Sequence, residues 1–86
     1  MLAEHSLDVS LLEPCEPLER ILAALPQLPA GHYLHVLHRM EPHPLYPILK
    51  QLGYAWITQV GQQVELFIWQ RDDIQAEQSV KALLKL

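Results

Sequence analysis

Apolar side chains follow two different periods along the first half of the chain. Residues 7–12 alternate between apolar and polar before becoming fully apolar, which predicts a short strand. Residues 16–25 carry leucine and isoleucine at three- and four-residue spacings, with Pro17 at the first helical position, and this predicts an amphipathic helix. After a stretch broken by proline and glycine, residues 33–38 return to strand character.

The second half continues with another helix and a pair of strands. Residues 45–52 form the predicted helix, with prolines confined to its start and Gly53 suited to a left-handed position at its end. Residues 54–60 and 64–69 are rich in aromatic and β-branched side chains, which favour strands. The short Gly61-Gln62 link between them predicts a hairpin with a type II′ turn.

This order of elements, βαβαββ, predicts an α/β fold of the α+β two-layer sandwich type. We expect a four-stranded mixed sheet with two helices on one face, because a strand, helix, strand order favours a crossover unit. Residues 1–6 form an N-terminal extension and residues 7–71 the domain itself. Residues 72–86 are weakly periodic and predict an extra C-terminal helix.

Alternation within the strands assigns side chains to the two faces of the sheet. The face under the helices receives the predicted core: Leu34, Val36, Val64, Leu66 and Ile68. The other face receives a second and unusually apolar set: Tyr33, His35, Leu37, Phe67 and Trp69. Exposed apolar patches usually mark interfaces, so we expect the tail helix or a second copy of the chain, as a homodimer, to cover this face.

Charge and composition exclude several classes of protein. The 86 residues include only six Lys plus Arg and carry a formal net charge of −4, which argues against nucleic acid as a partner. No apolar run approaches the length of a membrane span, and the N-terminus lacks the features of a signal peptide. A single cysteine, Cys15, excludes an internal disulfide. We therefore expect a cytoplasmic protein with no membrane partner.

Two stretches of the sequence resemble known families. Leu7-Asp8 followed by residues 11–18 is similar to the signature of the TusA/SirA sulfur carriers, in which a strand runs into a Cys-Pro-x-Pro motif that opens a helix. Residues 36–47, with Gly53-Tyr54, resemble a bacterial family of unknown function placed beside those carriers. Together the resemblance spans Leu7 to Arg71. It implies the fold of the carriers and a relay of persulfide sulfur from a donor to an acceptor protein.

The chain departs from the carrier signature at the residue that holds the sulfur. Aligning Glu16-Pro17 with the end of the motif places Pro14 at the position of the carrier cysteine and Cys15 one residue later. A helix N-terminus stabilises a thiolate, but Cys15 also has three glutamates within four residues, which oppose ionisation. Cys15 is therefore a candidate sulfur-handling residue, and a partly buried thiol that fills a capping position is the alternative.

Histidine is frequent, with five residues in the chain and four of them between His32 and His43. Imidazole is a common ligand of transition metals, so the cluster raises a metal hypothesis. His35 and His38 lie on opposite faces of the predicted strand and cannot chelate together. His38 and His43 could converge across the intervening loop, and surface or capping histidines are the alternative.

The loop from His38 to His43 follows the end of a strand and precedes a helix, which is where open α/β sheets place their sites. Cys15 follows its own predicted strand at the same edge. We therefore group Cys15 with Arg39, Glu41 and His43 as a candidate site for binding more than for turnover. The alternative is that Arg39 and Glu41 only solvate a turn.

Two functions from different classes follow. The first is a small carrier or interaction module in sulfur or redox traffic, which works through Cys15 and docks a larger protein partner. The second is an accessory domain that binds a ligand or metal through His38 and His43. A stand-alone enzyme ranks third, because no nucleophile-base arrangement or phosphate-binding loop is visible, and no cofactor is expected.

Overall fold

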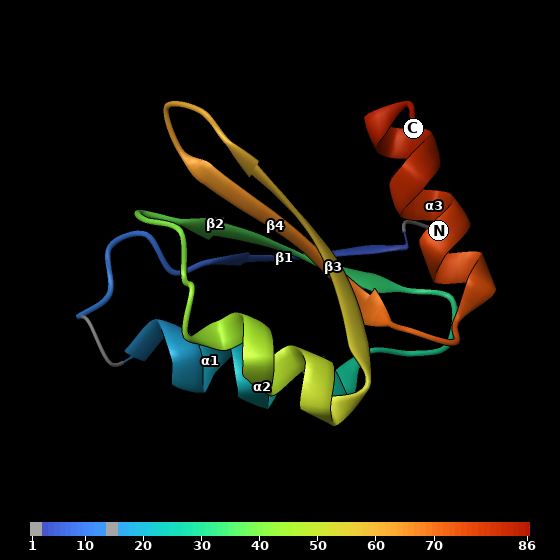
Figure 1. The fold of residues 1–86 in the computed structure, drawn as a ribbon, viewed down its shortest axis with the longest axis horizontal. Helices are drawn as coiled ribbons and strands as arrows, with labels where there is room; N and C mark the ends of the chain where they lie inside the picture. Colours follow the sequence, from blue (N-terminus) through green and yellow to red (C-terminus); the bar gives the residue numbers. More distant parts are fainter. Residues whose placement is uncertain (1–2, 14–15) are drawn as a thin grey trace.

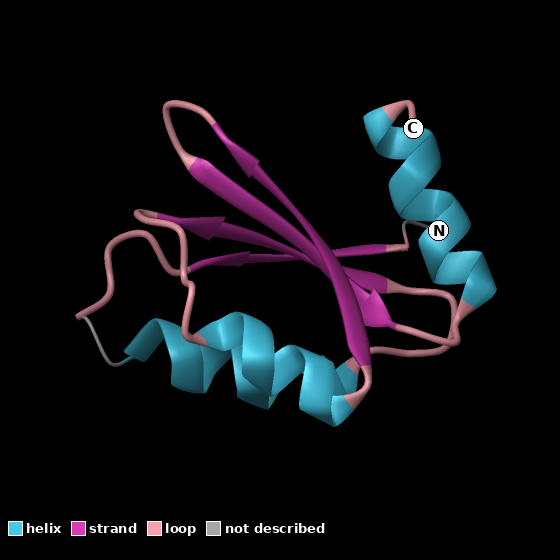
Figure 2. Cartoon of the chain, in the orientation of Figure 1, coloured by secondary structure: helices cyan, strands magenta, loops and turns pink. Residues whose placement is uncertain are grey.

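The computed structural model describes residues 3–13 and 16–86 as a four-stranded mixed sheet with helices on both faces (Figures 1 and 2). The predicted α+β fold and the βαβαββ order are confirmed, and a third helix follows. The elements are β1 (Glu4–Asp8), α1 (Glu16–Ala24), η1 (Leu25–Gln27), β2 (Tyr33–His38), α2 (Leu45–Leu52), β3 (Tyr54–Val60), β4 (Val64–Gln70) and α3 (Ile74–Leu84).

The strands lie in the order β1-β2-β4-β3. β1 runs parallel to β2, with Glu4 opposite Tyr33, as the crossover through α1 requires. β4 is antiparallel to both of its neighbours, β2 and β3. This order leaves β1 and β3 at the two edges of the sheet.

The predicted strand over residues 7–12 is wrong in its position, because β1 begins earlier and ends at Asp8. The Asp8 carboxylate accepts hydrogen bonds from the Ser10 amide at 2.9 Å and the Ser10 hydroxyl at 2.6 Å, which turns the chain out of the sheet. Leu11 beyond the turn is 93% exposed. Local bonding by the aspartate therefore outweighs the apolar run that suggested a longer strand.

The predicted two-residue turn between β3 and β4 is also wrong. Val60 pairs with Val64, so the loop has three residues, and the Gly61 amide donates to the Gln63 carbonyl at 3.1 Å. A type II′ turn needs a positive φ at its glycine, and among the described glycines only Gly31 and Gly53 have one. Gly53, with φ of 89°, ends α2 in the predicted left-handed conformation.

Each face of the sheet has its own hydrophobic cluster. Beneath α1 and α2, all five predicted core residues are buried, together with helix residues such as Ile21 and Leu49. On the opposite face, α3 buries Ala76 and Val80 against Tyr33, Phe67 and Trp69. The tail helix therefore covers these three residues, as predicted. His35 and Leu37 remain half-buried, and a homodimer through this face stays a prediction.

The position of α3 depends on one carboxylate. Asp73 caps the helix by accepting from the Ala76 amide at 3.0 Å, and its other oxygen accepts from the Gly31 amide at 2.7 Å. These bonds keep the pKa of Asp73 below its usual range. The cap thus joins α3 to the loop that leads into β2.

Among the helices of the described residues, none combines the length and the apolar character that a membrane span requires.

Candidate functional site

An apolar groove lies where α1 begins and where the chain leaves β2. Its volume is about 390 Å³, and its walls come from α1 through Pro17, Leu18 and Ile21 and from the β2–α2 loop through Met40 and Glu41. A smaller cavity of about 80 Å³ extends it towards Val9 and Leu12. The two share Pro17, His38 and Met40 in their walls, so they adjoin each other, and we call them together the α1 groove. Apolar concavities with few polar groups are typical of binding sites.

Prolines give the groove its wall on the loop side. β2 ends at His38, and Pro42 and Pro44 in the loop that follows have no amide to donate to a sheet ladder. The amides of His43 and Leu45 then donate to the carbonyls of Glu41 and Pro42 at 3.0 and 2.9 Å, which closes tight turns before α2. The loop is consequently held beside the first turn of α1.

His38 is the buried polar group of the α1 groove, with only 8% of its surface exposed. Its Nδ1 atom accepts a hydrogen bond from the Met40 amide at 3.2 Å. Burial lowers the pKa of His38, and the positive charge of Arg39 lowers it further. The neutral ring therefore carries its proton on Nε2, because Nδ1 is occupied as an acceptor.

Glu41 is held at the rim by a chain of hydrogen bonds from β3. Thr58 Oγ1 lies 2.7 Å from the Tyr46 hydroxyl, which donates to Glu41 Oε2 at 2.9 Å. The Tyr46 ring stacks on Trp56 at a centroid distance of 5.3 Å. Burial and Glu41 raise the pKa of Tyr46, against an opposing effect of Thr58. Tyr46 of α2 thus fixes the carboxylate in position, and Thr58 of β3 in turn fixes the Tyr46 hydroxyl.

The structure brings together part of the predicted site. His38 and Glu41 line the α1 groove, and Arg39 lines its smaller extension. His43 is 75% exposed and contributes no wall; its Nε2 atom lies 3.7 Å from Glu41 Oε1. Pro14 and Cys15 lie outside the described residues. Within residues 3–13 and 16–86, no group of three or more His, Cys, Asp or Glu side chains is arranged to hold a metal ion.

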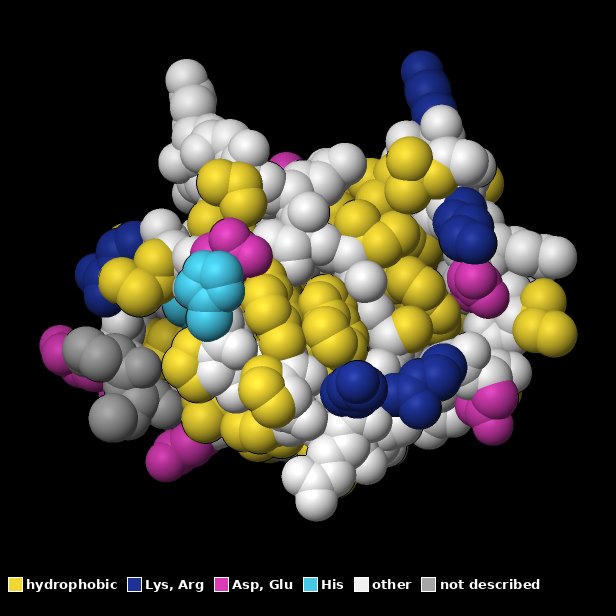
Figure 3. All heavy atoms as spheres, viewed as in Figure 1, with side chains coloured by type: hydrophobic (Ala, Val, Ile, Leu, Met, Phe, Trp, Pro, Cys, Tyr) yellow, Lys and Arg dark blue, Asp and Glu magenta, His cyan; other side chains and the backbone are white. Residues whose placement is uncertain are grey.

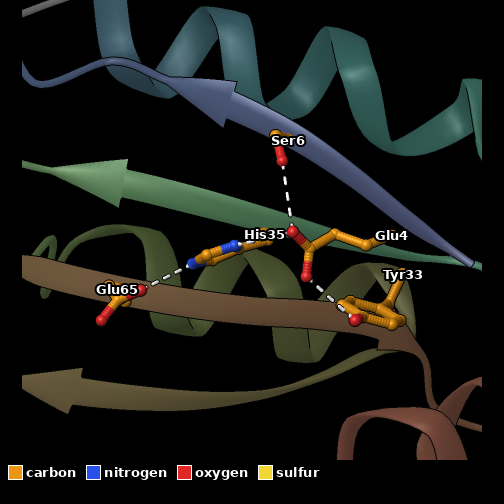
Figure 4. Close-up of polar contacts among 5 residues, drawn as sticks. All are labelled: Glu4, Ser6, Tyr33, His35 and Glu65. Atoms are coloured by element: carbon orange, nitrogen blue, oxygen red, sulfur yellow. Dashed lines mark hydrogen bonds and ion pairs between the residues drawn. The ribbon is translucent and has the colours of Figure 1, made fainter. Parts of the chain in front are cut away.

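A polar network on the opposite face of the sheet was not predicted from the sequence (Figure 4). His35 Nδ1 lies 3.1 Å from Glu4 Oε2, and its Nε2 atom lies 2.8 Å from Glu65 Oε1. The imidazole stacks on Phe67 at a centroid distance of 4.5 Å. The three polar residues come from β1, β2 and β4, so only the register of the sheet could have revealed the network.

Glu4 has three hydrogen-bond partners in this part of the sheet. Burial alone would raise the pKa of Glu4, but hydrogen bonds from His35, Tyr33 and Ser6, with the charge of His35, outweigh it and lower the pKa. Tyr33 donates to Glu4 Oε1 at 2.9 Å, and burial together with this bond raises the pKa of Tyr33 to about 12. Both His35 nitrogens lie within hydrogen-bonding distance of a carboxylate, so the imidazole links Glu4 on β1 to Glu65 on β4 across β2.

These features define a small α+β protein with a mixed sheet and an apolar groove beside the start of its first helix. A family model described as an uncharacterized conserved protein (DUF2249) matches residues 6–70. The chain belongs to this family. The matched range contains the α1 groove and ends before α3. Neither the curated proteins nor the solved structures include a match to the chain.

Proposed function

We propose that this protein is a small carrier or interaction module in bacterial sulfur or redox traffic, related to the TusA/SirA carriers and located in the cytoplasm. It would dock a larger partner protein through the α1 groove. The observation that carries the proposal is the position of this groove: its wall includes Pro17, in the first turn of α1, and Cys15 is the residue immediately before that helix.

The chemistry of such a carrier is one thiol exchange. The Cys15 thiolate attacks the outer sulfur of a persulfide on the donor, the donor sulfur-sulfur bond breaks, and the donor leaves as a thiolate while Cys15 becomes the persulfide. The apolar walls of the groove suit an apolar segment of the partner, and the charges of Arg39 and Glu41 at its ends give orientation. No other catalytic group is required.

The carrier step is tested by intact mass after incubation with a cysteine desulfurase and cysteine. We expect the wild-type chain to gain one sulfur atom and Cys15→Ser to gain none. The double variant Pro14→Cys/Cys15→Pro restores the residue order of the carriers and serves as a positive control. Sulfur on this double variant but not on the wild type would contradict the carrier role for the natural chain.

The docking role of the groove needs a separate variant. Met40→Glu places a charge on the groove wall at a residue that is 61% exposed, so the fold tolerates it. We expect slower sulfur transfer from the desulfurase, with unchanged reactivity toward a small disulfide. Leu11→Glu, which places the same charge at an exposed leucine that does not line the groove, is the matched control. Equal transfer rates for the two variants would argue against docking at the groove.

Metal or ligand binding through His38 and His43 is the second candidate, and the tautomer of His38 weighs against it. The Met40 amide occupies Nδ1, so a metal at Nε2 would have to displace a proton. His43 also stands outside the groove. Elemental analysis of the purified wild-type protein and of His38→Gln tests this candidate. One equivalent of metal in the wild type that is lost in His38→Gln would favour metal binding over the carrier function.

A further inference from the structure

The two edges of the sheet differ in how they are protected from pairing with another chain. β1 carries charged or titratable side chains at Glu4, His5 and Asp8. β3 has seven residues, Tyr-Ala-Trp-Ile-Thr-Gln-Val, with no charge and no proline. Natural edge strands usually carry charges, prolines or bulges that prevent association. Among the described strands, none covers the outer edge of β3.

The hydrogen-bond pattern identifies which backbone groups face outward from β3. The Arg71 amide donates to the Gly53 carbonyl, which places bonded pairs at Ala55, Ile57 and Gln59 in the alternating ladder with β4. The N–H and C=O groups of Trp56 and Thr58 therefore point away from the sheet. Both residues are half-buried, and the Trp56 ring stacks on Tyr46, so an incoming strand would meet aromatic surface at Trp56.

Opposite charges stand near the two ends of this edge. Lys50 and Arg71 line a depression beside Tyr54, and Arg71 Nη2 lies 2.8 Å from the Lys50 carbonyl. At the other end, the Glu41 carboxylate accepts a hydrogen bond from the Tyr46 hydroxyl, which is itself bonded to Thr58 of β3. In Figure 3, Lys and Arg side chains gather over the end of α2 and the start of β3, acidic and histidine side chains gather over the β2–α2 loop, and apolar surface lies between them.

We propose that two copies of this chain associate through antiparallel pairing of their β3 edges, centred on Ile57. Trp56 of each copy then faces Thr58 of the other, so their outward backbone groups all find partners. The same two-fold arrangement brings Lys50 and Arg71 of one copy towards Glu41 of the other, twice per dimer. A parallel pairing would place like charges together. The dimer has one continuous sheet with α1 and α2 of both copies on the same face.

This dimer differs from one through the sheet face, because α3 keeps Tyr33, Phe67 and Trp69 covered. It is also independent of sulfur transfer, so neither proposal depends on the other. The expected state in solution is a dimer that weakens as salt is added, since the paired charges are partly exposed.

Sedimentation equilibrium of the full chain tests the proposal with variants that reverse the charge at position 50 or at position 41. We expect Lys50→Glu alone and Glu41→Lys alone each to weaken the dimer roughly tenfold, while an equimolar mixture of the two associates like the wild type. Arg20→Glu makes the same charge reversal at an exposed residue of α1, away from β3, and should leave the dimer unchanged. Val60→Pro, which removes an outward-facing amide at a residue 66% exposed, should abolish association.

Hydrogen exchange locates the contact. In concentrated wild-type protein, the amides of Trp56 and Thr58 should exchange more slowly than in dilute protein, and no such change should occur in β1. A wild-type chain that remains monomeric at a concentration of several hundred micromolar would overturn the proposal. So would a dimer that persists in every variant, or a mixture of the two charge variants that does not associate.

Discussion

The two faces of the sheet show two ways of burying a strand. On the face covered by α1 and α2, apolar side chains form a continuous cluster from β1 to β3, and Val36, Leu66 and Ile68 at its centre have no exposed surface. On the other face, α3 buries only one end, and the middle holds the polar network of His35, Glu4 and Glu65. The family domain therefore supplies one complete core, whereas the second cluster depends on a helix beyond the matched residues.

A matched pair of substitutions should expose this difference most strongly. Val36→Ala and Val80→Ala each remove the same atoms from residues that are 0% exposed. Val36 lies in a central strand that alanine disfavours, and we expect a loss of about 3 kcal/mol. Val80 lies in a helix that alanine favours, so we expect a loss of only about 1 kcal/mol. Urea denaturation measures both, and equal losses would contradict the comparison.

The attachment of α3 should be weakened by removing its cap. Asp73→Ala loses the bonds to the Ala76 and Gly31 amides, and we expect a cost of about 1 kcal/mol. The loss should be local, so amides of α3 exchange faster and Trp69 fluorescence shifts towards that of an exposed indole. Asp72→Ala, at the exposed neighbouring residue, is the control. A fully protected α3 in Asp73→Ala would show that side-chain packing alone holds the helix.

The smallest expected effect concerns Glu4 in the polar network. Since the pKa of folded Glu4 lies below its ordinary value of 4.5, the carboxylate contributes stability above that pH and loses it as the pH falls through the folded value. Glu4→Gln should cost less than 1 kcal/mol at pH 7, because the side chain is 29% exposed, and should flatten the fall of stability in acid. Thermal unfolding of the wild type and of Glu4→Gln between pH 7 and pH 3 measures this pH dependence of stability, with Glu19→Gln as control. Identical profiles for the wild type and Glu4→Gln would contradict the role of Glu4.

The sequence predicted most of the fold because the relevant patterns are local. β2 and α2 have the predicted bounds, and the five core residues were assigned from alternation alone. The predicted end of β1 and the predicted turn after β3 were wrong, because short-range hydrogen bonds decide the path of the chain there. The Asp8 carboxylate bonds the Ser10 amide after β1, and the Gly61 amide bonds the Gln63 carbonyl in a three-residue loop. The apolar pattern carries no information on such bonds.

The candidate site was predicted less completely. His38, Arg39 and Glu41 do border the α1 groove, because they lie at the end of β2 or just after it. His43 was grouped with them by its proximity in the sequence, but the turns before α2 leave it in solvent. The role of Cys15 stays a prediction. The Tyr46 contacts that fix Glu41 join α2 to β3 and have no signature in the chain.

The order of strands and helices, the two faces of each strand and the main core can be predicted from the chain alone, because helical and strand periods are properties of neighbouring residues. The contacts between side chains of different strands depend on the tertiary structure. The strand register joined Glu4, His35 and Glu65, and packing set α1 beside the β2–α2 loop to form the groove. The strand order also left β3 without a neighbour on its outer side among the described strands. These outcomes depend on contacts between residues far apart in the chain, which no local pattern encodes.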